Sequence, residues 1–266
     1  MNVFRREMRA NYKSLLVWVL VIAGFNVMVL SIYPSFAADS AKLEALLSAY
    51  PEQLTKIFGL DRLNLGDPLG FFGTEIYFMV LLFGSIFAAI LGAGLLAKEE
   101  DEKTIEFLLA RPVTRARILA DKVLTYVVCV VAFNILVGAL SYAAFAMLVT
   151  QAYSVKALLL LLVAPVFVHL TFASLGFLMA LFFTRRRAVY SVTIGLVVGL
   201  YFLGAAALLA RGFEWLKWLS PFRYVDAANI VTSQSISVVN VLILLAVNVA
   251  AVAATYALYR RRDIMV

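Results

Sequence analysis

Few residues of this sequence are of a type that could carry acid–base or metal chemistry. The chain has one histidine, His169, and one cysteine, Cys129. A histidine inside an apolar run could relay protons or contact a substrate, but no Asp or Glu lies inside the long apolar runs to partner it. We therefore favour a structural hydrogen bond for His169. Glu75, just ahead of an apolar run, is a second weak candidate for substrate contact, with capping as its favoured role. A single cysteine excludes an internal disulfide and a multi-cysteine metal site, so no metal site is expected.

Several catalytic patterns are missing or broken. The sequence contains no G-x-x-x-x-G-K-[ST] phosphate-binding loop, so ATP hydrolysis by that route is excluded. An intramembrane protease of the Glu-Glu-x-x-x-Arg kind is excluded because Thr104 stands at the arginine position after Glu99 and Glu100. A metal-dependent lipid transferase would need paired acids, but Asp101 and Glu102 are adjacent and cannot share a helix face. The chain is therefore not expected to be an enzyme.

The composition is that of an integral membrane protein. Of 266 residues, 64% are hydrophobic and 15% are charged, whereas soluble domains have about 45–50% and about 25%. Only helices satisfy their own backbone in lipid, and about 20 residues cross the hydrocarbon layer. The sequence therefore predicts an all-α membrane protein with six transmembrane helices, over the uncharged runs Leu15–Tyr33, Ile76–Ala97, Val123–Val149, Ala157–Phe183, Ala188–Ala210 and Val238–Tyr259.

The positions of the basic residues predict the orientation of these spans. With both termini in the cytoplasm, 16 Lys and Arg residues lie in inside segments and 7 in outside segments, as the positive-inside rule requires. We therefore expect a multi-pass protein of the cytoplasmic (inner) membrane with both termini cytoplasmic. Topology and membrane lipid account for the net charge of +7, so nucleic-acid binding is not expected.

Two segments outside the spans are predicted to carry amphipathic helices. In residues 1–14, Val3, Phe4, Met8 and Tyr12 lie near one helical face, which predicts a short interfacial helix; a plain basic flank is the alternative. In the outer loop 34–75, apolar residues from Leu43 to Phe58 repeat with helical spacing. This outer helix is either a lid that packs on the spans, which we favour, or a substrate gate.

The cytoplasmic region 98–117 is the most informative stretch of the chain. Acidic residues lead into Thr104, a capping residue, and Ile105, Leu108 and Leu109 then lie on one side of a short helix that Pro112 stops. Thr114 can cap the next helix, which returns to the membrane. Such a helix with charged flanks could dock a soluble partner or lie among lipid headgroups. Five acids among residues 99–106 fit poorly against an anionic leaflet, which favours docking.

At these residues the sequence resembles the permease subunits of ABC-2-type exporters. Their link between the second and third spans is matched by Thr104, Glu106, Leu108, Leu109, Ala110, Pro112, Val113, Thr114, Arg115 and Lys122. The sequence departs from the pattern at Lys103, where the family usually has Gly. The basic N-terminal helix, the large outer loop, the arginine-rich tail and the outer Ser220-Pro221-Phe222-Arg223-Tyr224 segment extend the resemblance.

The resemblance implies a single permease domain over residues 1–266 that exports cargo with the help of a separate ATPase. ATP and Mg²⁺ would bind that partner, present in two copies, and none would bind this chain. A second copy of the permease, expected as a homodimer, or else a paralogous permease would complete the transporter. The residues expected to contact the ATPase are Thr104, Ile105, Glu106, Phe107, Leu108, Leu109, Arg111, Pro112 and Arg115.

The cargo is predicted only by class. The spans show no charged row and no ion pair, which favours an apolar pathway for an amphipathic or hydrophobic cargo such as a peptide, an antibiotic or a lipid-like molecule. The alternative function is an ion- or proton-coupled secondary transporter or a channel, which would need intramembrane acids or interrupted helices in matched halves. Small residues suited to helix contact occur in three spans, at Gly84, Ala88 and Gly92, at Gly195 and Gly199, and at Ala246, Ala250 and Ala254.

Overall fold

The structure, a computed structural model, describes residues 3–38, 55, 60–101, 114–207 and 212–261. Across these residues, six helical runs are long and apolar enough to cross a bilayer, as predicted. Each contains most of one of the predicted apolar runs. They are Val3–Ser35, Pro68–Glu99, Arg115–Leu148, Val155–Phe182, Arg186–Ala207 and Val238–Arg261.

The N-terminal region differs from the prediction of a separate interfacial helix over residues 1–14. One continuous helix, α1, runs over Val3–Ala38. Its first turns are part of the bundle, because Val3 and Glu7 are buried and Met8 packs against the core. Glu7 lies four residues after Val3 and three after Phe4, so it shares their helix face and is buried like Val3 despite its charge.

The second span also begins earlier than predicted. Helix α4 (Pro68–Phe71) continues through the π-helical turn η1 (Phe72–Ile76) into α5 (Tyr77–Asp101). Asp67 caps the start, its carboxylate accepting from the backbone N–H of Gly70 at 3.1 Å. Both ends of the predicted loop 34–75 are therefore helical, because α1 extends to Ala38 and α4 begins at Pro68. The predicted outer helix from Leu43 to Phe58 lies outside the described residues, apart from Thr55.

The remaining helices follow with defined starts. Side-chain oxygens of Thr114, Ser154 and Asp226 cap α7, α8 and α11. Pro165 divides the fourth span because its ring interrupts the helical hydrogen bonding. These elements are α7 (Arg115–Leu148), α8 (Val155–Val163), α9 (Pro165–Met179), η2 (Ala180–Phe182), α10 (Arg186–Ala207), η3 (Glu214–Leu219), η4 (Pro221–Val225), α11 (Ala227–Ser233) and α12 (Val238–Arg261).

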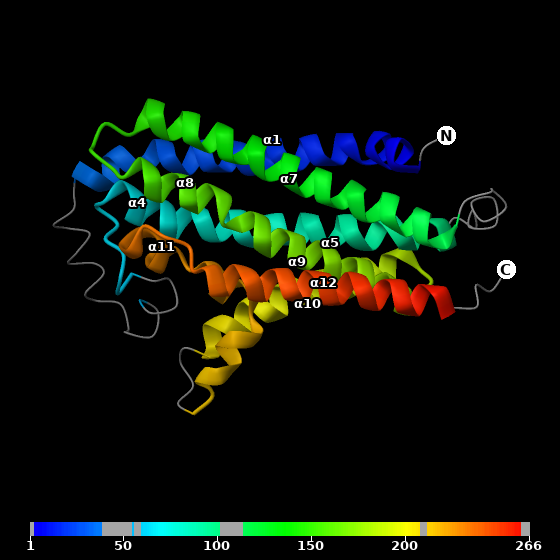
Figure 1. The fold of residues 1–266 in the computed structure, drawn as a ribbon. Helices are drawn as coiled ribbons and strands as arrows, with labels where there is room; N and C mark the ends of the chain where they lie inside the picture. The colour runs from blue at the N-terminus through cyan, green and yellow to red at the C-terminus, as the bar shows by residue number, and fades with distance from the viewer. Residues whose placement is uncertain (1–2, 39–54, 56–59, 102–113, 208–211, 262–266) are drawn as a thin grey trace.

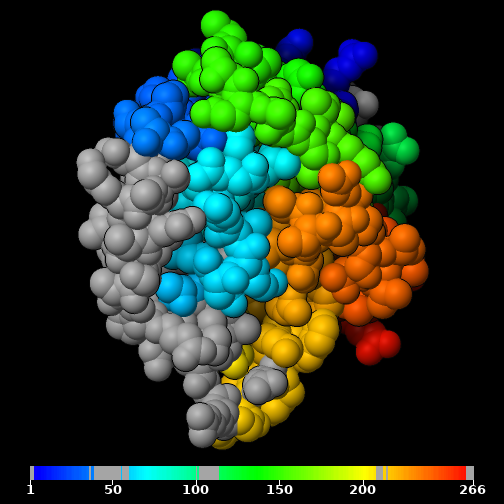
Figure 2. Space-filling view, turned by 90° about the vertical axis from the view of Figure 1, so that its left-hand side faces the viewer, coloured from blue at the N-terminus to red at the C-terminus, as the bar shows by residue number. Residues whose placement is uncertain are grey.

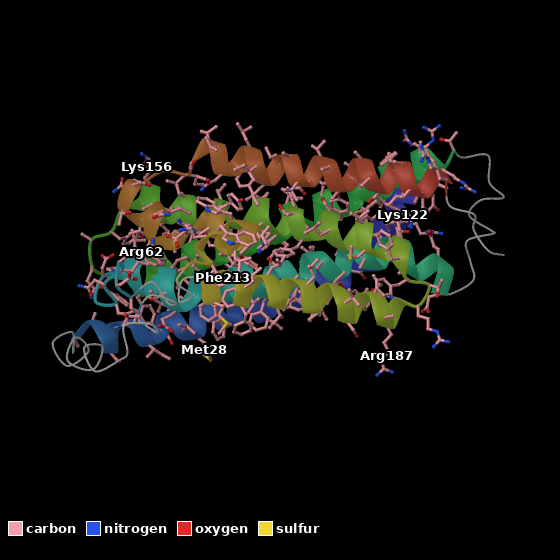
Figure 3. The ribbon with its side chains drawn as sticks, turned by 90° about the horizontal axis from the view of Figure 1, so that it is seen from below. Met28, Arg62, Lys122, Lys156, Arg187 and Phe213 are labelled. Atoms are coloured by element: carbon pink, nitrogen blue, oxygen red, sulfur yellow. The ribbon has the colours of Figure 1, made fainter. Side chains whose placement is uncertain are left out.

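The long helices lie side by side along one direction, with both chain termini at the same end of the bundle, here called the terminal end (Figure 1). Viewed from the opposite end, the chain around the start of α5 is central and the other segments surround it (Figure 2). Lys122 and Arg187 lie at the terminal end, and Arg62 and Lys156 at the opposite end (Figure 3). This grouping agrees with the predicted sidedness of these four residues.

Small residues bring α5 and α9 into backbone contact. A Cβ on Gly92 would lie 2.0 Å from the carbonyl oxygen of Ala173, and a Cβ on Gly176 would lie 2.3 Å from that of Ala89. Such close approach explains why side chains are excluded there. The small-residue face of the second span is thus occupied inside the chain, whereas a Cβ on Gly195 or Gly199 of α10 would meet nothing within 4 Å.

Polar side chains inside the bundle pair with one another across helices. Asn26 of α1 donates to Ser141 of α7 at 2.8 Å. The Oδ1 atom of Asn248 in α12 accepts from Ser174 of α9 at 2.7 Å. The amide of Asn248 donates to Thr171 at 3.0 Å. Each pair satisfies groups that lipid cannot, and so links neighbouring helices.

Candidate functional site

Most residues predicted to contact the ATPase lie outside the described residues. These are Thr104, Ile105, Glu106, Phe107, Leu108, Leu109, Arg111 and Pro112. The two helices that flank this segment are described: α5 ends at Asp101 and α7 begins at Arg115, both at the terminal end of the bundle (Figure 1).

The start of α7 is built as predicted. The hydroxyl of Thr114 accepts from the N–H of Arg117 at 3.3 Å, which confirms its capping role. Arg115, the one predicted contact residue that the structure describes, donates to the carbonyl of Tyr259 at 3.4 Å. Arg115 therefore links the start of α7 to the end of α12.

A charge cluster lies beside this region and joins three helices. It consists of Arg6 and Glu7 of α1, Lys98 and Glu99 of α5, and Lys122 of α7. The Lys122 ammonium lies 2.8 Å from a Glu99 carboxylate oxygen and also donates to the carbonyl of Leu95. The other oxygen of Glu99 accepts from Arg6 at 2.5 Å.

Glu7 is the second anion of the charge cluster. It accepts from Lys98 and, at 3.1 Å, from Arg6. Glu7 and Lys122 are fully buried and Glu99 is 3% exposed. Removing one partner of such a buried pair costs about 3–5 kcal/mol because the other charge is left uncompensated. The charge cluster therefore holds α1, α5 and α7 together at the end where residues 102–113 are attached.

A groove of 670 Å³ extends from the charge cluster between α1, α5 and α10. Its part at the terminal end, here called the mouth, is polar, with Arg6, Lys98, Glu99, Asn11 and Arg186 among its walls. Toward the middle of the spans it is lined by Trp18, Phe87, Ile90 and Leu91. Gly94 leaves room for the Tyr190 hydroxyl, which would lie 2.5 Å from a Cβ there. That hydroxyl accepts from Arg186 at 2.8 Å. The groove thus combines a charged mouth with an apolar wall.

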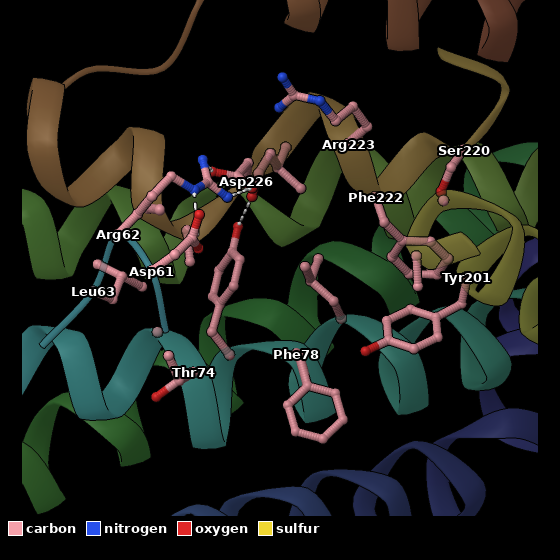
Figure 4. Close-up of a pocket in the computed structure, with 18 residues that line it drawn as sticks. Asp61, Arg62, Leu63, Thr74, Phe78, Tyr201, Ser220, Phe222, Arg223 and Asp226 are labelled. Atoms are coloured by element: carbon pink, nitrogen blue, oxygen red, sulfur yellow. Dashed lines mark hydrogen bonds and ion pairs between the residues drawn. The ribbon is translucent and has the colours of Figure 1, made fainter. Parts of the chain in front are cut away.

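A second cavity of 320 Å³ lies at the opposite end, between α5, α10 and η4 (Figure 4). Arg62 binds both carboxylate oxygens of Asp226, at 3.0 and 2.9 Å, and these hydrogen bonds raise the pKa of the guanidinium. Tyr201 and Phe222 pack edge to face, 5.4 Å between centroids. The Ser220–Tyr224 segment singled out in the sequence thus contributes Ser220, Phe222 and Arg223 to this wall.

The family comparison agrees with the expected family. The model of the family described as ABC-2 family transporter protein matches residues 1–264. The chain belongs to the ABC-2 transporter family. No match was found among proteins of curated function.

This membership fixes the general role of the chain. ABC-2 permeases lack a catalytic ATPase domain, which agrees with the missing phosphate-binding loop, and they associate with an ABC ATPase. The chain is thus the membrane component of an ABC-2 transporter. An ion-coupled carrier or channel, the alternative function, is not favoured by this finding.

The two weak substrate candidates of this ABC-2 permease lie apart from the groove. His169 is fully buried and its Nδ1 lies 3.0 Å from the Oδ1 of Asn134, while a Cβ on Gly84 would lie 2.4 Å from its ring. Glu75 lies within the second helical run, in η1, and not ahead of it as predicted; its side chain is exposed. Neither residue is among the described residues that line the groove or the second cavity.

The charge cluster was missed in the sequence, where the spans were expected to contain no buried ion pair. Lys98 and Lys122 directly adjoin apolar runs and were taken as positive-inside markers. The helices continue past those runs, so the charges are enclosed by the bundle. The sequence feature that could have indicated the charge cluster was Glu7, an acid among the basic residues Arg5, Arg6 and Arg9. Among the residues that the structure describes, no group of His, Cys, Asp or Glu could hold a metal ion.

Proposed function

We propose that this ABC-2 permease is the membrane subunit of an exporter for an amphipathic or hydrophobic cargo, which passes along the α1–α5–α10 groove. The observation that carries the proposal is the groove itself, whose charged mouth and apolar wall match the two parts of an amphipathic molecule. The protein lies in the inner membrane with its terminal end on the cytoplasmic side, as the distribution of Lys and Arg predicts.

Residues 104–111 form the helix that docks on the ATPase, and two permeases assemble with two ATPase subunits. ATP and Mg²⁺ bind the ATPase. Support comes from the family membership and from the two flanking helices, whose ends at Asp101 and Arg115 lie at the terminal end. The two permease copies meet through α10 or α12, because the small-residue face of α5 is already covered by α9.

The test uses the complex of permease and cognate ATPase in nanodiscs. The complex should hydrolyse ATP, whereas the permease alone should not. For the groove, Ile90→Cys in a Cys129→Ala background is labelled with a charged maleimide. Trapping the ATPase with ATP and vanadate should change the labelling rate about tenfold, as expected for a shift of about 1.4 kcal/mol between two conformations.

The matched control for the groove is Ile135→Cys. Ile135 is 62% exposed on α7 but does not line the groove. In the membrane this position should face lipid, so the charged reagent should label it slowly in both states. If Ile90→Cys behaves like Ile135→Cys, the groove is not a water-accessible pathway and the proposal is wrong.

A further inference from the structure

The charge cluster and the groove lie on the same faces of α1 and α5. On α1, Glu7 is followed by Asn11, Ser14 and Trp18, a spacing that keeps one helix face, and the last three line the groove. On α5 the same holds for Phe87, Ile90, Leu91, Gly94 and Lys98. Arg6, Lys98 and Glu99 belong to both sites.

The charge cluster also lies beside the proposed docking segment. Lys98 is three residues before the end of α5, and Lys122 is seven residues after the start of α7. Residues 102–113 connect these two ends. Any force on this segment therefore acts first on the helix ends that Glu99 and Lys122 hold together at 2.8 Å.

α1 is joined to these ends only a short distance from its own start. Arg6 reaches Glu99 and Glu7 accepts from Lys98, so α1 is bound to α5 by two charged contacts. Because α1 is one continuous helix, a displacement at Glu7 also moves Trp18, about 16 Å further along the same face. The width of the groove between α1 and α5 depends on that displacement.

We propose that the charge cluster is the link through which movement of the ATPase-docked segment 102–113 reaches α1 and changes the groove. Glu7 and Arg6 are thus positioning residues for transport. The inference rests on the proposed function, since it assumes that the ATPase docks at this segment. Glu7 and Lys122 are fully buried and Glu99 is 3% exposed, so water competes little for the two carboxylates and Lys122, and the three helices move together.

The test compares two variants of Glu7 in the permease–ATPase complex that carries Ile90→Cys and Cys129→Ala. Glu7→Gln keeps the shape and removes the charge, and Glu7→Asp keeps the charge and shortens the side chain. Lys98 lines the groove, so its ammonium can be hydrated when its partner becomes neutral. We expect Glu7→Gln to assemble and to hydrolyse ATP, while the vanadate-dependent change in labelling falls from about tenfold to below about twofold. Glu7→Asp should keep most of the change.

A second variant covers the case in which Glu7→Gln does not assemble. Arg6→Gln removes a cation whose side chain is 38% exposed and leaves both buried pairs intact. It should reduce the labelling change in the same way, whereas Arg9→Gln, an exposed cation on the same helix, should not.

The outcomes distinguish failure of the proposed link through the charge cluster from failure of the proposed function. If the unaltered complex forms and shows the tenfold change, and Glu7→Gln and Arg6→Gln show it as well, the charge cluster is not the link. The same conclusion follows if Glu7→Gln retains more of the change than Glu7→Asp, because packing and not charge would then matter. If the unaltered permease forms no complex or shows no change, the proposed function itself fails.

Discussion

The ammonium of Lys122 lies 2.8 Å from the carboxylate of Glu99, and the side chains are 0% and 4% exposed. Lys122 lies two turns inside α7 and Glu99 near the end of α5, so this pair joins the two helices that residues 102–113 connect. A buried pair costs desolvation free energy and contributes mainly when both partners are present. The contribution of the Lys122–Glu99 pair to stability can therefore be tested by replacing one partner and then both.

Lys122→Met should destabilise the permease by about 3–5 kcal/mol, because Glu99 loses its buried partner. The measurement is the free energy of unfolding in detergent. Combining it with Glu99→Leu should recover much of the loss, since the carboxylate that lost its partner is then removed as well, while Glu7 keeps Lys98 and Arg6 as partners. Lys156→Met, an exposed lysine at the opposite end, should change the stability by no more than about 0.5 kcal/mol. Additive effects of the two single changes would contradict direct pairing.

The α5–α9 contact gives a second prediction. Gly92→Ala places a Cβ 2.0 Å from a backbone oxygen, so the helices must separate and the melting temperature should fall clearly. Gly195→Ala has open space and should be neutral or stabilise by up to about 1 kcal/mol through helix propensity. Equal effects of the two changes would show that this contact is not as close as described.

A larger side chain at Gly195 tests whether two permease copies meet through α10. If two copies meet through α10, Gly195→Leu should leave the folded monomer intact and weaken the permease dimer, as seen by size-exclusion chromatography with light scattering. If the dimer survives, the remaining small-residue face is that of α12, where Ala246 and Ala250 are exposed.

His169 should act structurally. His169→Ala leaves the Asn134 oxygen without its partner and creates a cavity, so it should cost about 2 kcal/mol or more of stability. His169→Gln can still donate to Asn134 and should support ATP-driven transport. Loss of transport in a well-folded His169→Gln protein would instead indicate a role in the pathway.

Sequence reasoning succeeded where the signal was local. The six spans followed from uncharged runs, and the Thr114 cap followed from residue type and position. It failed where long-range contacts decide, because the burial of Glu7 depends on Lys98, which is 91 residues away. The groove could not be predicted because it is formed by three helices whose packing order the apolar pattern does not contain. The sequence shows a small-residue face on each of α5, α10 and α12. Only the structure, in which α9 packs on α5, shows that the face of α5 is covered within the chain.

Orientation is tested by labelling from the two sides of the membrane. In a Cys129→Ala background, Ala45→Cys and Trp215→Cys should react with a membrane-impermeant maleimide from outside, and Lys103→Cys and Arg187→Cys only from inside. Trp215 and Arg187 are both exposed, so their thiols would be reachable. Outside labelling at Lys103 would overturn the predicted topology and the placement of the ATPase.

The docking segment gives the last prediction. The sequence predicts that residues 104–111 form a helix with apolar side chains on one side. Central apolar anchors dominate interface energetics, with truncations that cost about 2 kcal/mol or more. Phe107→Ala or Leu108→Asp should therefore release the ATPase or uncouple hydrolysis from transport, as measured by co-purification and by ATP hydrolysis in the complex. Lys103→Gly, which restores the usual residue of the family, should be tolerated.

The matched control for the docking segment is Arg117→Ala. Arg117 is 67% exposed and pairs with Asp121 at 3.3 Å within α7, so its loss removes a charge near the docking segment without removing an anchor. It should reduce co-purification little. Thermal stability of the permease alone distinguishes a docking defect from misfolding, because Leu108→Asp should leave that stability unchanged. If Leu108→Asp leaves the complex and transport intact, residues 104–111 do not dock the ATPase, and the partner must contact another part of the terminal end.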